Sequence, residues 1–409
     1  MSDLFSGARH WYKKGGFSSL LRSSAVYASG SAVTKVAAGG YSGLLAESNQ
    51  PTELGDQYWE LKDEVDELSG DIYAEIASFA AHEKKEFRRV PSYDFRQPFL
   101  IEANDVYLTG PHAAAITEDT VFGDAIRTDI DKTRWMLNEA IISSPRRVGS
   151  VLFNHSVPSS AKQIDTACVL YHQTGNFYHW VIEQFPKLRA VERYEAETGK
   201  DVALIIKSDS PPYVEEFLAL LGHQREQICW YGEPYWVKDL VVPSLPEPTP
   251  GSLGWLQKIA AESTNDKKNS DSWIYVSRQN ASRGRCVANW EDVRQVLEQN
   301  NVAVIRPEEL SMTEQIRIFS HADGVIGPHG AGMTGVIWGK DLKVIELFNE
   351  VVKPSTYLLS KILNHKYVPL FCDGCGSRSQ QINENMFVDE INILKLNNLI
   401  KCDNKNYSV

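Results

Sequence analysis

The sequence lacks several features that mark particular classes of protein. Its 409 residues hold six cysteines at irregular spacing, so no disulfide framework is expected and a reducing cytoplasmic setting is favoured. No run of 18 apolar residues and no compact signal-peptide core is present, so neither a membrane-spanning helix nor a leader is expected. The formal net charge of −11 is spread along the chain, which argues against nucleic acid as a partner.

One stretch is unusually rich in glycine. Gly327 to Thr334 lies between the apolar runs 324–326 and 335–338, which predicts a strand, a glycine-rich turn and a helix. Because glycine has no side chain, the backbone N–H groups of such a turn can approach and bind an anion such as a diphosphate. We therefore expect a nucleotide or nucleotide-sugar there. A turn that serves only tight packing is the alternative.

The N-terminal residues 4–27 combine basic and aromatic side chains with a single acid, Asp3, beside them. Such a segment on an acidic protein fits a helix lying on an anionic membrane surface. A helix packed on the domain or on a second subunit, as in a homodimer, is the alternative.

Apolar runs, separated by stretches rich in glycine, serine and proline, predict two α/β domains. We expect an N-terminal segment and linker at 1–50, a first domain at 51–242 and a proline-rich linker at 243–254. A second domain at 255–370 alternates strands and helices regularly, which predicts a parallel sheet covered on both faces, and a tail at 371–409 packs back on the first domain.

Polar residues at strand ends of the second domain suggest an anion site. Arg278 ends the first strand and presents a planar fork suited to diphosphate oxygens. Arg283 and Arg285 follow closely, and we rank both below Arg278, with solvated loop charges as the alternative. His329 can donate to phosphate or sugar oxygens from the turn. Glu346, inside an apolar strand, is expected to accept from ribose hydroxyls, with a buried ion pair as the alternative.

The first domain contains a dense polar and aromatic segment from Asn176 to Arg189. A helix starting near Phe177 places His179 and Glu183 on one face at i and i+4, where they suit a general base oriented by its partner. The alternative is an i, i+4 pair on the helix surface with no role in catalysis. Tyr178, Trp180 and Phe185 are candidates for stacking on a sugar.

Two weaker patterns concern metals. Asp129-Ile-Asp131 has the D-x-D form that holds a metal-bound diphosphate, but two acids in a hydrophilic stretch also arise by coincidence. Cys372-Asp-Gly-Cys375 has only Cys402 and His365 nearby as further zinc ligands, so a turn with reduced cysteines is favoured.

Three segments together resemble the family 61 glycosyltransferases: NFYHWVIEQFPKL, YVSRQNASRGRCVANWEDV and GPHGAGMTGVIW, within residues 170–348. The resemblance implies the GT-B architecture, in which two Rossmann-like domains with parallel sheets face each other across a cleft, here with an N-terminal helical extension. It also implies inverting transfer of a sugar, of the EC 2.4 class, onto surface-glycan or O-linked acceptors.

The resemblance assigns roles to individual residues. Asn176, His179 and Glu183 match the family's acceptor-side segment, and Arg278, His329, Gly330, Ala331, Gly332 and Met333 match its diphosphate motifs. Our own hypothesis is that Glu183, coupled to His179, is the catalytic base. We add Tyr178 and Trp180 to the acceptor side and Arg283 and Glu346 to the donor side from their positions. Two departures stand out: Trp290 separates Asn289 from Glu291, and Glu183 replaces a more frequent aspartate.

The resemblance implies a UDP- or GDP-sugar donor, a glycan, glycoprotein or lipid-linked glycan acceptor, and no tightly held cofactor or metal. We expect a cytoplasmic protein, peripheral at the inner face of the membrane if residues 4–27 bind it. The alternatives are a non-catalytic sugar- or nucleotide-binding module, which could dispense with His179 and Glu183, and a NAD-dependent oxidoreductase. The latter needs glycines in its first strand-to-helix turn, where this chain has three arginines and one glycine at 277–288.

Overall fold

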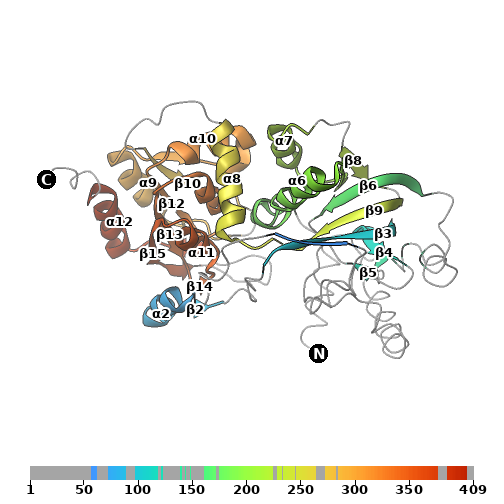
Figure 1. Cartoon of the computed structure of the whole chain (residues 1–409). Helices are drawn as coiled ribbons and strands as arrows, with labels where there is room; N and C mark the ends of the chain where they lie inside the picture. Colours follow the sequence, from blue (N-terminus) through green and yellow to red (C-terminus); the bar gives the residue numbers. More distant parts are fainter. Residues whose placement is uncertain are drawn as a thin grey trace, which may run out of the picture.

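The fold is built around two separate sheets, which Figure 1 shows at opposite ends of an elongated molecule. The computed structural model describes residues 57–61, 72–88, 97–117, 121–122, 139–140, 143, 148, 161–171, 175–223, 228–232, 234–244, 246–263, 272–281, 284–375 and 385–402. Residues 4–27, Asp129, Asp131 and Arg283 therefore lie outside the described residues.

The first sheet is mixed, with the order β5-β4-β3-β9-β6-β7-β8 and β1 paired to β3. Its strands are β1 (Gln57–Glu60), β3 (Phe99–Thr109), β4 (Ala114–Ile116), β5 (Val121–Phe122), β6 (Lys162–Leu170), β7 (Ala203–Lys207), β8 (Ile228–Tyr231) and β9 (Tyr235–Pro243). Only β9, β6, β7 and β8 run parallel to one another, whereas β1, β3, β4 and β5 pair antiparallel. The expectation of a parallel sheet therefore holds for part of this sheet, because β3 inserts antiparallel beside β9.

The second sheet is entirely parallel, as its regular alternation of strands and helices predicts. Its strands are β10 (Trp273–Val276), β11 (Ala303–Ile305), β12 (Gly324–Pro328), β13 (Lys343–Phe348) and β15 (Lys366–Phe371). The order β11-β10-β12-β13-β15 means that the first strand lies between the second and the third. The connections from β10 and β12 consequently leave in opposite directions along the sheet, which opens a crevice outside their carboxyl ends.

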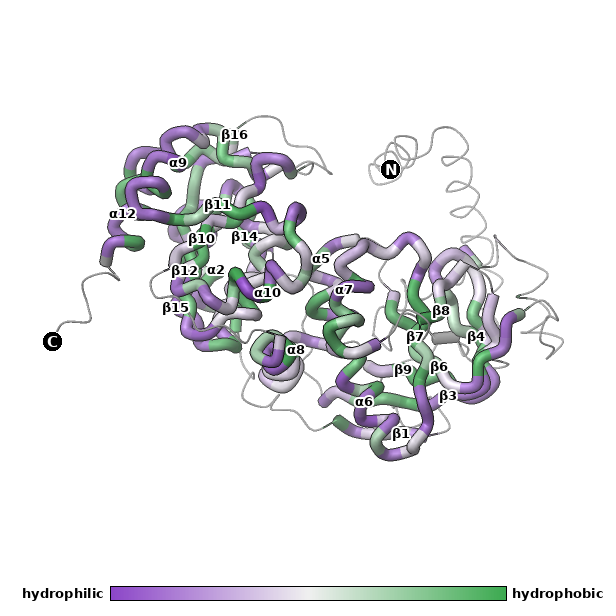
Figure 2. The backbone as a smooth tube through the Cα atoms, turned by 90° about the horizontal axis from the view of Figure 1, so that it is seen from above, coloured by the Kyte–Doolittle hydropathy of each residue, from purple (hydrophilic) through white to green (hydrophobic). Residues whose placement is uncertain are grey.

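Helices cover both sheets, and Figure 2 shows hydrophobic residues concentrated along the strands. They are α2 (Ala74–His82), α5 (Phe177–His179), the π-helix η3 (Trp180–Gln184), α6 (Lys187–Thr198), α7 (Pro212–Leu220), α8 (Pro250–Ser263), α9 (Trp290–Gln299), the 3₁₀ turn η5 (Pro307–Glu309), α10 (Met312–His321), the 3₁₀ helix η6 (Ala331–Trp338), α11 (Ser355–Ile362) and α12 (Glu390–Cys402). One hydrophobic cluster joins elements of both sheets, from Leu170 and Phe217 to Val325 and Trp338. The two halves therefore share part of their core.

Residues 72–88 lie beside the second sheet, although we expected them in the first domain. The strand β2 (Glu86–Phe87) pairs parallel with β14 (Val351–Val352), and α2 packs on Phe348, Val352 and Tyr357. Figure 1 shows α2 and β2 next to β14, far from the strands that precede and follow them in the chain. Residues 53–86 have helical periodicity in the sequence, but β1 occupies Gln57–Glu60 within that range and pairs with β3.

The proline-rich stretch 243–254, expected as a linker, contains the start of a helix. α8 begins at Pro250, where a proline without an N–H is tolerated because first-turn donors have no intrahelical partner. Thr249 and Ser252 bind each other's backbone N–H groups through their hydroxyls at 3.2 and 2.9 Å, which caps this end.

The last described segment also differs from expectation. α12 packs against α9 and the second sheet through Leu396 and Ile400, and not against the first sheet. The antiparallel pair of β16 (Asp373–Cys375) and β17 (Asn385–Phe387) leads the chain to this helix.

Candidate active site

The glycine-rich turn and Arg278 meet at the crevice between β10 and β12. Arg278 follows the carboxyl end of β10, and the turn follows the carboxyl end of β12, its parallel neighbour. In open α/β sheets ligands bind at this point, because helix N-termini and loop N–H groups converge there. The two features that the sequence singled out separately therefore form one site.

Glycines permit the close packing of this turn. A Cβ at Gly330 would lie 2.1 Å from Nη1 of Arg278, so only a bare backbone lets the guanidinium lie on the turn. A Cβ at Gly332 would lie 2.9 Å from Val276, and one at Gly335 would lie 2.3 Å from Phe319. Gly330, Gly332 and Gly335 have the G-x-G-x-x-G spacing of dinucleotide-binding turns, although here it follows the third strand of the sheet.

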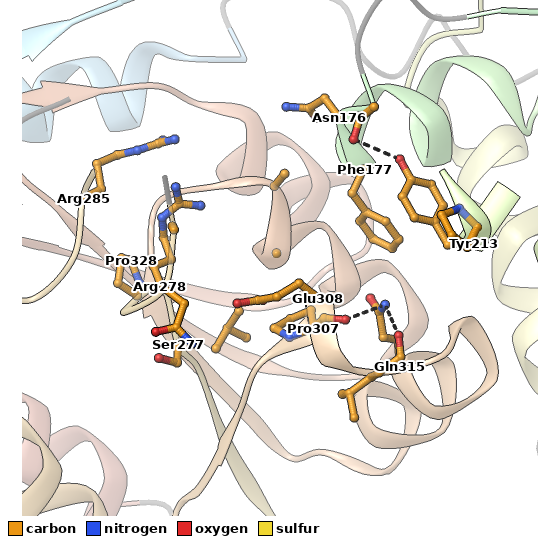
Figure 3. A pocket seen from close by; sticks show the side chains of 18 of the residues that line it. Asn176, Phe177, Tyr213, Ser277, Arg278, Arg285, Pro307, Glu308, Gln315 and Pro328 are labelled. Atoms are coloured by element: carbon orange, nitrogen blue, oxygen red, sulfur yellow. Dashed lines mark hydrogen bonds between the residues drawn. The ribbon is translucent and has the colours of Figure 1, made fainter. Parts of the chain in front are cut away.

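A cavity of about 690 Å³ lies over this crevice, and Figure 3 shows its lining residues. Arg278, Ala331 and Gly332 line it from the second sheet, together with the 3₁₀ turn that holds Pro307 and Glu308. Gln315 fixes that turn, because its Nε2 donates to the carbonyl oxygens of Pro307 at 3.0 Å and Leu310 at 3.2 Å. A cavity of this size matches a nucleotide-sized ligand.

Elements of the first sheet close the other side of the cavity. Asn176, Phe177 and Tyr213 line it, and the rings of Phe177 and Tyr213 meet edge to face at 5.1 Å. Tyr213 donates from its hydroxyl to the Gly175 carbonyl at 3.3 Å. Asn176 begins the short helix α5 as expected, because its side chain accepts from the Tyr178 N–H at 3.0 Å.

His179 and Glu183 form the predicted pair. His179 Nδ1 and Glu183 Oε1 are 2.9 Å apart, across the junction of α5 and the π-helix η3. The two side chains differ in access, since His179 is 39% exposed and Glu183 is 10% exposed. Neither lines the cavity itself, but α5 contributes Phe177 to its wall and lies against η6, the helix that the glycine-rich turn opens. π-helical turns occur frequently at functional sites.

The aromatic neighbours of this pair are placed differently from each other. Tyr178 is half-buried, and its ring meets that of His179 edge to face at 5.6 Å. Trp180, which we expected on the acceptor side, is 1% exposed and packs in the core against Phe185. Trp180 therefore stabilises the fold, as one of the five buried residues of the π-helical turn η3.

His329 is held from behind by Glu346. The Glu346 carboxylate is fully buried and accepts from His329 Nδ1 at 2.7 Å, from the Thr356 hydroxyl at 2.8 Å and from the Tyr367 hydroxyl. The buried pair that we weighed as an alternative is therefore what the structure contains, and Glu346 does not reach the cavity as a ribose ligand would. Burial lowers the pKa of His329, against the opposing effect of Glu346, so the ring is neutral at pH 7.

Met333 also differs from its expected role. It is fully buried, and a Cβ at Gly327 would lie 2.7 Å from its sulfur, so the side chain packs beneath the turn. Its backbone N–H is engaged as well, because it donates to the Gly330 carbonyl at 2.9 Å, so Met333 supports the turn from within.

Of the charged residues that line the cavity, Glu308 was not singled out by the sequence motifs, and Arg285 was considered only as a loop charge. Glu308 is exposed at the end of β11, and Arg285 lines the cavity from the loop after Arg278. Arg278 Nη2 donates to the Gly284 carbonyl at 3.3 Å, which ties that loop to the site. The position of Glu308 after the second strand of the sheet was the available signal, because an acid there binds ribose in dinucleotide folds.

The described residues contain no group of three His, Cys, Asp or Glu side chains arranged to hold a metal ion. Cys372 is buried and burial raises its pKa to about 12, so this thiol is protonated. His365 lies elsewhere, with Nδ1 accepting from the Leu342 N–H and Nε2 3.0 Å from the Val336 carbonyl. Within the described ranges no helix is long and apolar enough to cross a membrane.

The second half of the chain is an α/β unit with a parallel sheet and a cationic, glycine-rich crevice at its switch point. Residues 177–345 match the family model of glycosyltransferase 61, so this part of the chain is similar to that family. The family implies glycosyltransferase activity, and its model covers both the His179–Glu183 pair and the Arg278 crevice. No curated protein matches the chain.

Proposed function

We propose that the protein is an inverting, GT-B-type glycosyltransferase that moves a sugar from a nucleotide-sugar to an acceptor hydroxyl. The observation that carries the proposal is the single cavity lined by Arg278 and the glycine-rich turn on one side and by Asn176 and Phe177 on the other. A donor bound in the crevice would present its sugar toward the elements of the first sheet. Residues 51–242 and 255–370 would then act as acceptor and donor domains, with residues 72–88 added to the latter.

Arg278 and the backbone N–H groups of Gly330 to Gly332 would bind the diphosphate. The guanidinium lies on Gly330, so both kinds of donor point to one place. Positive charge and N–H donors there stabilise the negative charge that the leaving diphosphate gains. His329, fixed by Glu346, would act through its other ring nitrogen, Nε2, on the hydroxyls of the donor.

Glu308 takes the role first expected of Glu346, as acceptor for the ribose hydroxyls. It is exposed, lines the cavity and follows the second strand of the parallel sheet. Figure 3 shows it on the same side of the cavity as Arg278. Phe177 and Tyr213 offer aromatic surface for the base or the sugar.

His179 is the better candidate for the base that deprotonates the acceptor. Its imidazole is the more exposed member of the pair, and Glu183 would orient the ring and stabilise its protonated form. The acceptor oxygen would attack the sugar C1 opposite the departing phosphate oxygen, which inverts the anomeric configuration. This assignment exchanges the roles of His179 and Glu183 relative to the sequence-based hypothesis.

The donor and acceptor can be identified by a thermal-shift screen against UDP, GDP and their sugars, followed by transfer assays. We expect one nucleotide family to raise the melting temperature of the wild type, and Arg278→Ala to abolish the shift. We expect His179→Ala to lower kcat by at least about 100-fold while donor binding remains. Donor binding without any transfer or hydrolysis would favour a binding module instead.

The basic, aromatic segment 4–27 favours an acceptor at an anionic membrane surface, such as a lipid-linked glycan. Flotation with anionic liposomes tests this, with the full chain compared with one lacking residues 1–30. Equal recovery of both in the lipid fraction would remove the segment as an anchor.

A further inference from the structure

Lys353 lies at the same edge of the second sheet as the proposed diphosphate site. β13 ends at Phe348, whose ring stacks on His329 at 5.4 Å, and the chain then forms β14 before reaching Lys353. The Asn349 side chain accepts from the Val351 N–H at 3.3 Å and shapes this turn. The charge of Lys353 acts on His329, so Lys353 lies near the glycine-rich turn, and no sequence motif marked it.

Arg88 leaves its strand at the same end. β2 pairs parallel with β14, with Phe87 opposite Val352, and the Arg88 N–H donates to the Val352 carbonyl at 2.8 Å. Arg88 and Lys353 are thus the next residues along two adjacent parallel strands. Arg88 also binds Glu86 through Nε at 2.7 Å, which leaves its terminal nitrogens outside that bond.

Arg285 is the third cation, and it lies on the loop that follows Arg278. Its backbone has φ of 63°, a left-handed conformation that is strained for a residue with a side chain. Its loop is tied to Arg278 through the Gly284 carbonyl, and Arg285 lines the cavity. Strain of this kind persists where surrounding structure enforces it, frequently at ligand sites.

The electrostatics of Lys353 are unusual for a half-buried residue. No described side chain forms a hydrogen bond or ion pair with its ammonium group, and its charged neighbours are Arg285 and Arg88. Burial lowers the pKa of Lys353, and the two guanidinium groups lower it further. His329 is also within the field of Arg285 and Lys353. A desolvated cation surrounded by cations is costly unless an anion binds beside it.

We propose that Lys353, together with Arg285 and Arg88, binds the distal phosphate of the nucleoside diphosphate, the one bonded to the sugar. The inference rests on the proposed function. As the acceptor oxygen bonds to C1, the bond from C1 to the phosphate oxygen breaks and its electron pair stays on that oxygen. The acceptor proton passes to His179. Lys353 stabilises the charge that the distal phosphate gains, while Arg278 and Gly330 hold the proximal phosphate.

Titration calorimetry with nucleoside diphosphates and monophosphates tests the assignment on the full chain. UDP, UMP, GDP and GMP are titrated into the wild type, Lys353→Ala, Lys353→Arg and Lys366→Ala. Lys366 is a matched control, because it is exposed at the start of β15, at the opposite edge of the same sheet. We expect Lys353→Ala to weaken diphosphate binding at least about tenfold, since it removes a charge-assisted bond, and to leave monophosphate binding within about twofold. Lys353→Arg should retain most of the affinity, and Lys366→Ala all of it.

Thermal unfolding without ligand separates a binding role from a structural one. Because Lys353 has no partner to lose, we expect Lys353→Ala to melt at or above the wild-type temperature. A lower melting temperature, unchanged diphosphate affinity, or an equal loss for mono- and diphosphates would overturn the assignment of Lys353. Failure of the wild type to bind any of the four nucleotides would instead overturn the proposed function, and the inference with it.

Discussion

Glu216 of helix α7 accepts a hydrogen bond of 2.6 Å from the backbone N–H of Met312, the first residue of helix α10. α7 belongs to the first sheet and α10 covers the second, so this bond joins the two halves across the edge of the cavity. A carboxylate at a helix N-terminus binds a donor that has no intrahelical partner and interacts favourably with the helix dipole. Glu216 therefore links the two sides of the site by a hydrogen bond.

Removal of the Glu216–Met312 hydrogen bond should affect ligand binding as well as stability. We expect Glu216→Ala to lower the free energy of unfolding by about 1 kcal/mol and to raise the KM for the donor several-fold, because the cavity walls separate more easily. Glu314→Ala is the control, since Glu314 caps the same helix within its own capping box with Ser311. A control that raises the KM equally would mean that α10 stability, and not the link between halves, controls binding.

Gly330→Ala should disable the donor site without unfolding the protein. The new Cβ would lie 2.1 Å from Arg278 Nη1, and the far end of that flexible side chain can move away. We expect donor affinity to fall about as far as in Arg278→Ala, with a melting temperature near that of the wild type. Gly254→Ala is the comparison, because a Cβ there meets nothing within 4 Å in the helix α8. Wild-type donor affinity in Gly330→Ala would show that the position of Arg278 on the turn is unimportant.

Glu308→Ala should erase the preference for ribose over deoxyribose. We expect the wild type to bind UDP or GDP at least about tenfold more tightly than the 2′-deoxy form, and the variant to bind the two alike, since the lost interaction is a charge-assisted hydrogen bond. The neighbouring Glu309, which pairs with Arg306 at 3.4 Å, supplies the control Glu309→Ala. If Glu308→Ala keeps the full preference, another residue binds the ribose.

Stability should fall as the pH drops below about 6.5, the ordinary pKa of histidine. Burial lowers the folded-state pKa of His329 and of His365, so the unfolded chain binds more protons in this range. The contribution of these two histidines to the free energy of unfolding is complete above about pH 6.5. It is lost as the pH falls toward their folded-state pKa values. We expect His329→Gln to melt with a shallower pH dependence between pH 5 and 7 than the wild type. His82→Asn, at an exposed site, should retain the wild-type slope.

The second sheet could be predicted closely from the sequence. Apolar periodicity predicts a strand at 273–276 and helices at 290–300 and 313–321, and β10, α9 and α10 begin and end within a residue of these bounds. Buried parallel strands have continuous apolar runs and their helices are strongly amphipathic, so both periods are visible. The glycine-rich turn and Arg278 were recognisable for the same reason, because strand ends locate the crevice.

The remaining features depend on contacts that sequence order does not reveal. β6 begins with the polar pattern Lys162 to Thr166, and only Ala167 to Leu170 form an apolar run. The pairing of β2 with β14 joins residues more than 260 positions apart. Trp180 is buried in a π-helical turn that no composition rule predicts. Lys353 could not be found from a motif either, since its importance arises from cations brought together by that long-range pairing.

The pairing of β2 with β14 also makes the second half of the protein discontinuous in sequence. Among the described residues, β1 lies on the first sheet, α2 and β2 lie beside the second, β3 to β9 belong to the first, and the chain crosses again after β9. The described part of the chain therefore passes between the two halves three times, which restricts their relative motion more than a single linker would. A fragment that begins near residue 250 would expose the apolar surface of Phe348, Val352 and Tyr357 and would lack Arg88, so the second half is not an independent module.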